Sequence, residues 1–182
     1  QGFTDEGSPG RDWNVATGMV IEGKAGFQIM GDWAKGEFTA AGKVPGVDYY
    51  CAATPSNNGY LYNVDSFIFY KSSDPDKQAG QKLLAKLMMG KNFQKVFNLY
   101  KGSIPARLDV SMDEFDKCAK TSNADIKTAG ASGGLVPSFA HGMAQGNTMK
   151  AALQDIITEH FNSDMSSVDA ANALADSVLA NM

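Results

Sequence analysis

Apolar and polar positions along the chain predict short strands in its first half and amphipathic helices elsewhere. Period-two alternation, or a high density of β-branched and aromatic residues, is typical of strands. Such segments cover residues 25–30, 48–53 and 60–70, and the last is expected to be buried from Phe67 to Tyr70. Beyond Asp109 the pattern becomes mostly helical.

Apolar residues at helical spacing predict helices between and after these strands. In the first half they are expected at 13–23, 33–42, 75–90 and 92–100, with Asp32 and Asp74 as N-caps. In the second half helix is expected from Met112 through Cys118 and onward, before a glycine-rich loop at 130–134. Further helices are predicted to begin at Pro137, to carry the stripe from Met149 to Phe161, and to run from Val168 behind a Ser167 cap.

Composition and charge narrow the function classes. The chain has 182 residues, 43% of them hydrophobic, and a formal net charge of −4. An acidic chain whose basic residues are scattered is a poor partner for nucleic acid, because phosphate neutralisation needs clustered Lys and Arg. The apolar runs are far shorter than the ~20 residues of a membrane-spanning helix. The first residues contain neither an initiator Met nor a signal-peptide pattern, which is expected of a mature product or a fragment.

The two cysteines, Cys51 and Cys118, lie far apart and without histidines at metal-ligand spacing, so no metal site is expected. They are either a disulfide, worth about 4 kcal/mol on the loop-entropy model, or two unrelated buried thiols.

Catalytic groups are sparse. The available bases are His141 and His160, and His160 falls inside a predicted helix. His141 lies between two small residues, where other groups can approach it. No nucleophile-elbow, zinc-protease, P-loop or dinucleotide motif occurs, and we expect neither an enzyme nor a cofactor.

Several side chains are instead suited to sugar recognition, which needs an aromatic face for the ring and planar polar groups for neighbouring hydroxyls. They stand where packing alone does not require an aromatic or polar residue: Trp33, Asn63, Asp65, Lys101 and His141.

Five segments resemble the second half of an ABC-transporter extracellular solute-binding protein of family 1, the maltodextrin-binding-like type, and are most similar to its glucose or monosaccharide branch. They are residues 10–14, 23–33, 63–67, 101–107 and 140–144. The resemblance implies an α/β, type II periplasmic-binding-protein-like fold, here its C-terminal portion, helix-rich with short strands from both lobes. It assigns residues 1–54 and 109–182 to the second lobe and 55–108 to the hinge crossing and first lobe.

The resemblance also implies a function. It assigns Trp33 as the platform on which the sugar stacks and Asn63, Asp65, Lys101 and His141 as polar contacts. It places Cys51 and Cys118 where that branch carries a cysteine pair, and an exported, periplasmic compartment favours the disulfide. The implied partners are a monosaccharide, the permease subunits of the transporter, and either the missing N-terminal half or a second copy.

Two other functions remain open. One is a helical interaction domain whose stripes, including Met88 and Met89, dock a partner. The other is a hydrolase that uses His141 with Asp65.

Overall fold

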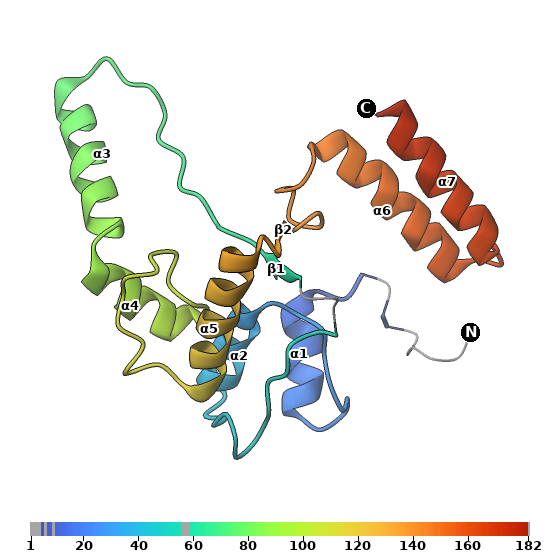
Figure 1. Ribbon diagram of the computed structural model, residues 1–182, viewed down its shortest axis with the longest axis horizontal. Helices are drawn as coiled ribbons and strands as arrows, with labels where there is room; N and C mark the ends of the chain where they lie inside the picture. Colours follow the sequence, from blue (N-terminus) through green and yellow to red (C-terminus); the bar gives the residue numbers. More distant parts are fainter. Residues whose placement is uncertain (1–4, 6, 9, 56–58, 182) are drawn as a thin grey trace. The chain divides into compact units, whose positions relative to one another are not determined.

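The computed structural model describes residues 5, 7–8, 10–55 and 59–181, and in these residues helices predominate over a small parallel sheet (Figure 1). The chain divides into two compact units. Unit 1 comprises Gln1–Asn57 and Ser66–Ser132, and unit 2 comprises Asn58–Asp65 and Gly133–Met182. No helix among the described residues combines the length and apolar character needed to cross a bilayer.

Unit 1 is built from helices, and most of them lie where the sequence predicts. They are α1 (Trp13–Ile21), η1 (Asp32–Ala34), α2 (Lys35–Ala40), α3 (Pro75–Met88), α4 (Lys91–Lys101) and α5 (Lys117–Ser132). Glycines end three of them in the left-handed region that residues with a side chain avoid. These are Gly23 after α1, Gly42 after α2 and Gly102 after α4, with φ of 73°, 71° and 87°.

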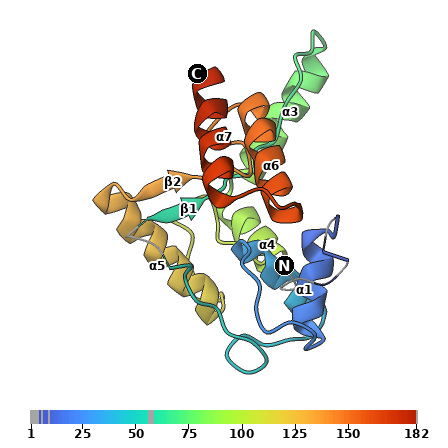
Figure 2. The ribbon, with the colours of Figure 1, turned by 90° about the vertical axis from the view of Figure 1, so that its right-hand side faces the viewer.

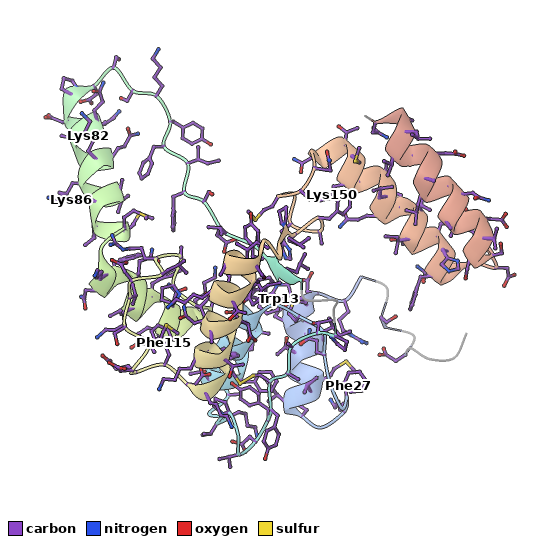
Figure 3. All side chains as sticks on the ribbon, viewed as in Figure 1. Trp13, Phe27, Lys82, Lys86, Phe115 and Lys150 are labelled. Atoms are coloured by element: carbon purple, nitrogen blue, oxygen red, sulfur yellow. A yellow bond between two sulfur atoms is a disulfide. The ribbon has the colours of Figure 1, made fainter. Side chains whose placement is uncertain are left out.

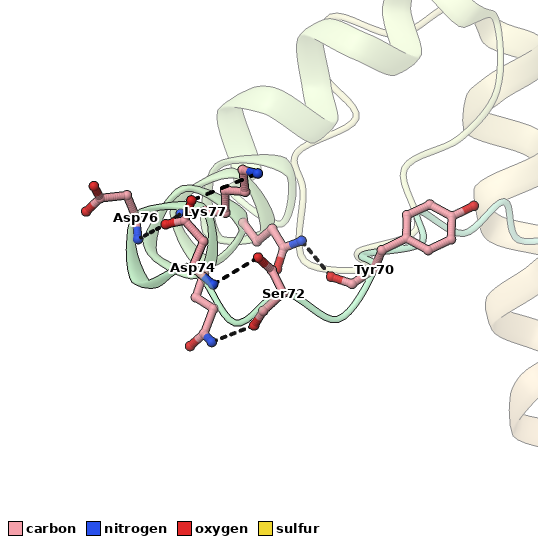
Figure 4. A network of polar contacts seen from close by, with 7 residues as sticks. Tyr70, Ser72, Asp74, Asp76 and Lys77 are labelled. Carbon is pink, nitrogen blue, oxygen red and sulfur yellow. Dashed lines mark hydrogen bonds and ion pairs between the residues drawn. The ribbon is translucent and has the colours of Figure 1, made fainter.

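The start of α3 shows how local chemistry fixes a helix boundary (Figure 4). The Asp74 carboxylate accepts hydrogen bonds from the backbone N–H groups of Asp76 and Lys77, at 2.9 and 3.3 Å. Pro75 occupies the first helical position, where no backbone donor is needed. Side chains of the first turns of α3 also hold the incoming chain, because Gln81 donates to the carbonyl of Tyr70 at 2.8 Å.

Two long-range connections join the N-terminal part of unit 1 to α5. The Lys35 ammonium donates to Asp116 Oδ2 at 2.8 Å, and Asp116 Oδ1 accepts from the backbone N–H of Ala119 in the first turn of α5. Cys51 and Cys118 form a disulfide across a sequence separation of 67 residues. On the loop-entropy model a bridge over that separation contributes about 4 kcal/mol.

Unit 2 consists of a two-stranded parallel sheet and a helical hairpin. Strand β1 (Tyr60–Tyr62) pairs with β2 (Leu135–Pro137), with Leu61 opposite Val136. Helices α6 (Asn147–Asn162) and α7 (Ser167–Ala180) lie side by side (Figure 2). Met149 of α6 and Ala170 of α7 are buried. The Ser166 hydroxyl caps α7 by accepting from the Asp169 N–H, so the cap is Ser166 and not the predicted Ser167.

The predicted strands are mostly wrong. Residues 25–30 form no strand, residues 48–53 take part only in an isolated bridge between Pro45 and Tyr49, and of 60–70 only Tyr60–Tyr62 is a strand. Phe27 projects from the chain as an exposed side chain (Figure 3). Ile68 and Tyr70 are 78% and 81% exposed, although the sequence predicts burial there. Strands need neighbours, and within the described residues no strand pairs with residues 25–30 or 67–70.

Three boundaries in the second half also differ from the predictions. Helix α5 begins at Lys117 rather than Met112, because Asp116 caps it, and it continues to Ser132 through most of the expected loop. The segment at Pro137 is the end of strand β2 and not the start of a helix, since Leu135–Pro137 pairs with β1. The compact units also divide the chain at other positions than the lobe segments expected from the resemblance. The lobe assignment itself stays a prediction.

Candidate functional site

The carboxyl ends of β1 and β2 bring three of the predicted site residues together in unit 2. Asn63 and Asp65 follow β1 directly, and His141 follows β2 after a short turn. Because the strands are parallel neighbours, their carboxyl ends lie at the same edge of the sheet. This is the edge at which ligands bind in open α/β sheets.

Contacts across this edge fix the two segments against each other. The backbone N–H of Ser138 donates to the carbonyl of Tyr62 at 2.9 Å, which extends the strand pairing by one residue. The backbone N–H of Val64 lies 3.1 Å from Met143 Sδ. The Asn63 amide donates to Asp65 Oδ1 at 3.1 Å, so these two side chains form one polar pair.

The turn that carries His141 is held by its own backbone. The N–H of Gly142 donates to the carbonyl of Phe139 at 2.9 Å, and the N–H of Met143 donates to the carbonyl of Ser138 at 3.0 Å. Gly142 has φ of 73°, which explains why glycine follows the histidine. Ser138 Oγ lies 2.6 Å from His141 Nδ1. This contact orients the imidazole through Nδ1, while His141 itself remains exposed.

The other two predicted site residues, Trp33 and Lys101, belong to unit 1. Trp33 lies in η1, and its six-membered ring folds over Gly31, where any Cβ would collide with it. Lys101 is the last residue of α4, where a cation interacts favourably with the helix dipole. Its Nζ lies 5.9 Å from the centre of the Phe97 ring.

The segments around Trp33 and Lys101 pack closely on each other. The Asp32 carboxylate accepts from the backbone N–H of Ile104 at 3.0 Å. A Cβ on Gly36 would lie 2.8 Å from the carbonyl oxygen of Lys101. Burial raises the pKa of Asp32, although the Ile104 N–H and the charges of Lys35 and Lys101 act in the opposite direction. Within unit 1 the two predicted site segments are thus joined by the Asp32 carboxylate and by the close approach of Gly36 to the Lys101 backbone.

Asp32 has a different role from the one expected. Gly31 is the N-cap of η1 and Asp32 is its first residue. Its carboxylate holds the turn after α4 through Ile104.

Sequence reasoning missed other residues at the unit 2 edge. Ser138 is 2% exposed, and only its position three residues before His141 could have signalled its contact. Lys150 of α6 also lies beside the histidine turn, since its Nζ would be 3.9 Å from a Cβ on Gly142 (Figure 3). The first turn of α6 therefore brings a cation to this polar edge.

The chemistry of these residues suits binding more than catalysis. Burial leaves the Ser138 hydroxyl inaccessible to a substrate carbonyl, which argues against a Ser–His nucleophile. Among the described residues no group of three His, Cys, Asp or Glu side chains could hold a metal ion. What the edge offers is a carboxylate, an amide and an imidazole, which can donate to and accept from adjacent hydroxyls.

Comparison with known proteins points in the same direction. No protein-family model matches the chain. It is 46% identical over 177 residues to a probable sugar-binding periplasmic protein of Brucella suis, and 44% identical over 177 residues to one of Rhizobium meliloti. These alignments cover 97% of this chain and 42% of either relative. An uncharacterized ABC transporter extracellular-binding protein of Pyrococcus horikoshii is 35% identical over 150 residues, 82% of this chain and 33% of that protein.

The chain thus spans less than half the length of the curated relatives it matches. All three relatives are named as binding proteins and none as an enzyme.

Proposed function

We propose that the chain is part of the sugar-binding component of an ABC uptake transporter and acts in the periplasm. The observation that carries this proposal is the 46% identity, over 97% of the chain, to a protein named as sugar-binding and periplasmic. The polar edge formed by Asn63, Asp65 and His141 supports it, because its donors and acceptors suit hydroxyl groups. The proposed ligand is a monosaccharide, glucose or a relative of it.

Each site residue has a proposed role. The Trp33 indole stacks on the apolar face of the sugar ring, and Lys101 donates to a ring or hydroxyl oxygen. Asp65 accepts from one hydroxyl, Asn63 exchanges hydrogen bonds with its neighbour, and His141 holds one more. The receptor mechanism is hinge closure, in which contacts from two lobes favour the closed state that the permease recognises. In this scheme residues 1–54 and 109–182 belong to one lobe and 55–108 to the other.

Replacing Trp33 tests the proposal. In the intact protein that contains these residues, Trp33→Ala is expected to weaken monosaccharide binding about 10- to 100-fold, since an aromatic contact is worth about 1.5–3 kcal/mol. Trp13, the other tryptophan of the chain, is the matched control, because it lies on α1. Trp13→Ala should leave the affinity within about twofold. Isothermal titration calorimetry with glucose, galactose and xylose measures both.

Two outcomes of these measurements would contradict the proposal. Equal affinities of the Trp33→Ala variant and the unchanged protein remove Trp33 from the site. An unchanged protein that binds none of the three sugars at millimolar concentration contradicts the proposed function.

A second candidate function, a helical interaction domain, is favoured by the exposed face of α3 and α4. An apolar groove on α4 is lined by Phe93, Val96, Phe97 and Tyr100, and an adjoining one includes Leu83 and Leu87 of α3. Met88, which the sequence offered for docking, is instead buried, while Met89 is exposed. Saturable monosaccharide binding that is sensitive to Trp33 would separate the first function from the second.

We propose a separate protein contact for residues 67–70, which precede α3: a strand from another polypeptide that completes a sheet with them. Residues 67–70 are apolar at every position, which is typical of a strand buried on both faces. In the described residues no hydrogen bond joins the backbone of Phe67, Ile68 or Phe69 to another residue. Such a run pairs readily with another strand. We assign that strand to the other half of a receptor or, failing this, to a second copy.

A further inference from the structure

The thioether of Met143 joins the two segments that form the polar edge of unit 2. The backbone N–H of Val64 donates to Met143 Sδ across a distance of 3.1 Å. Val64 stands between Asn63 and Asp65, and Met143 follows His141 by two residues. We propose that Met143 is an oxidation-sensitive positioning residue, whose sulfur sets the spacing of the two segments for sugar binding. This inference rests on the proposed function and makes it more specific.

Hydrophobic packing does not explain a methionine at this position. Met143 is 36% exposed, whereas Met149, in the first turn of α6, is 7% exposed. A methionine that fills space between apolar side chains is expected to be buried as Met149 is. Met143 instead lies at the surface, where its sulfur, a weak hydrogen-bond acceptor, meets a backbone donor of the neighbouring segment. The thioether therefore matters here for its acceptor and not for its apolar volume.

The sulfur contact extends the connection between the two segments beyond their backbone pairing. The pairing reaches the bond from the Ser138 N–H to the carbonyl of Tyr62, and Val64 lies two residues further along the chain. Met143 is itself fixed at the base of the histidine turn, because its N–H donates to the carbonyl of Ser138 at 3.0 Å. The contact therefore restrains the backbone after β1 against this turn. It acts on backbone positions and leaves the rotamers of the neighbouring side chains to other contacts.

Oxidation of this sulfur changes the spacing that it sets. Hydrogen peroxide transfers one oxygen atom to a thioether: the O–O bond breaks, a sulfur–oxygen bond forms, the sulfur gives up two electrons, and water leaves. The contact is exposed, so a small oxidant can reach it. In the sulfoxide the acceptor is the added oxygen, one bond length beyond the sulfur, and the Val64 N–H must move away from the turn to meet it. A binding site tolerates displacements of about 0.5 Å, so this shift lowers the affinity.

Amide exchange of Val64 tests the contact without any ligand. In the intact protein that contains these residues, Met143→Leu keeps the volume of the side chain and removes the acceptor. The Val64 amide should then exchange with solvent about threefold faster, as measured by NMR. Met165→Leu is the matched control, because it removes a thioether of the same unit beyond the other end of α6. It should leave the exchange rate of Val64 unchanged.

Calorimetry with glucose, galactose and xylose, before and after treatment with hydrogen peroxide, tests the positioning role. Oxidation of Met143, verified by peptide mass spectrometry, should weaken sugar binding by the unchanged protein about tenfold, and a methionine sulfoxide reductase should restore it. Met143→Leu should bind about threefold more weakly than the unchanged protein and should not weaken further in peroxide. Met165→Leu should respond to peroxide as the unchanged protein does.

Each of four results would overturn the proposal. They are an unchanged exchange rate of Val64 in the Met143→Leu variant, an unchanged sugar affinity of that variant, a Met143 that peroxide leaves unoxidised, and a loss of affinity in peroxide that Met143→Leu shares with the unchanged protein. If the unchanged protein binds none of the three sugars, the proposed function fails. The exchange rate of Val64 then still decides whether the sulfur of Met143 joins the two segments.

Discussion

The ion pair between Lys35 and Asp116 is expected to be a large single contribution to the stability of unit 1. The side chain of Lys35 is 7% exposed and that of Asp116 is 33% exposed. Removing one partner of a fully buried pair costs about 3–5 kcal/mol, and removing one of a surface pair costs about 0–1 kcal/mol. Since one partner is buried and the other is partly solvated, we expect Asp116→Asn to cost about 2 kcal/mol.

The substitution is chosen to isolate the charge. Asp116 also caps α5 through the bond from Ala119, and asparagine is as good an N-cap as aspartate. The loss therefore reports the buried ammonium of Lys35 rather than the helix end. Glu114→Gln is the matched control, because it removes an exposed pair with Lys95 of 2.6 Å and should cost less than about 0.5 kcal/mol.

The contribution of Asp116 to the free energy of unfolding should decrease at low pH. Desolvation, the largest single effect on Asp116, raises its pKa, but the hydrogen bond and the charge of Lys35, with the backbone N–H groups of Ala119 and Cys118, outweigh it and lower the pKa below its ordinary value. A carboxyl with a lowered pKa stabilises the fold above its unfolded pKa, and this contribution is lost as the pH falls through the folded value. The difference between the unchanged protein and Asp116→Asn should therefore be constant from pH 7 to about pH 5 and shrink below about pH 4.

Urea unfolding followed by tryptophan fluorescence measures these differences, because Trp33 lies two residues from Lys35. The double variant Lys35→Met with Asp116→Asn completes a cycle, and it should lose less than the sum of the two single variants. The reasoning is refuted if Asp116→Asn and Glu114→Gln cost the same at pH 7, or if the effect of Asp116→Asn grows as the pH falls.

Two further predictions concern backbone packing and association. Gly102→Ala should lower the free energy of unfolding by about 2 kcal/mol or more, because φ is 87° and the new Cβ would collide with the backbone nitrogen of Gly36, whereas Gly80→Ala, in open space within α3, should raise it by up to about 1 kcal/mol. Urea titrations in which both variants lose stability equally would contradict this. The 182-residue chain alone should self-associate through its exposed apolar run at 67–70, and light scattering that finds a stable monomer with cooperative unfolding would contradict it.

Helices could be predicted from the sequence because their determinants are local. Asp74 and Pro75 fix the start of α3 within a few residues, and Gly102 ends α4 where the chain must enter the left-handed region. The same local logic located α1 and the α6–α7 hairpin. It misplaced the cap of α7 by one residue because two serines, Ser166 and Ser167, stand side by side.

Strands could not be predicted in the same way, because a strand exists only where another strand pairs with it. The run from Phe67 to Tyr70 has a stronger strand composition than Leu135–Pro137, yet only the second is a strand. What makes the difference is β1, which offers its backbone to Leu135, Val136 and Pro137. Composition cannot reveal which segment finds such a neighbour.

The residues of the candidate site also differ in whether the sequence alone can suggest them. Trp33 and Lys101 could be proposed from the sequence, as aromatic or charged residues in polar segments, and their role in a site stays a prediction. Ser138 could not, because neither its burial nor its 2.6 Å contact with His141 Nδ1 can be deduced from the sequence. The parallel pairing of β1 with β2 explains why Asn63 and His141, nearly eighty residues apart, meet at one edge.

The exposed run at 67–70 and the polar edge after β1 differ in whether a neighbouring strand pairs with the backbone. At the carboxyl end of β1 the pairing with β2 ends, and the residues that follow include the polar pair Asn63 and Asp65. A few residues later the chain turns wholly apolar, and the tie to Gln81 at Tyr70 satisfies one carbonyl of the run. A segment with unpaired backbone groups and apolar side chains on both faces lowers its free energy only by joining a sheet. Strand partners at 67–70 would therefore also restrain the chain just after Asp65, the last residue of the polar edge.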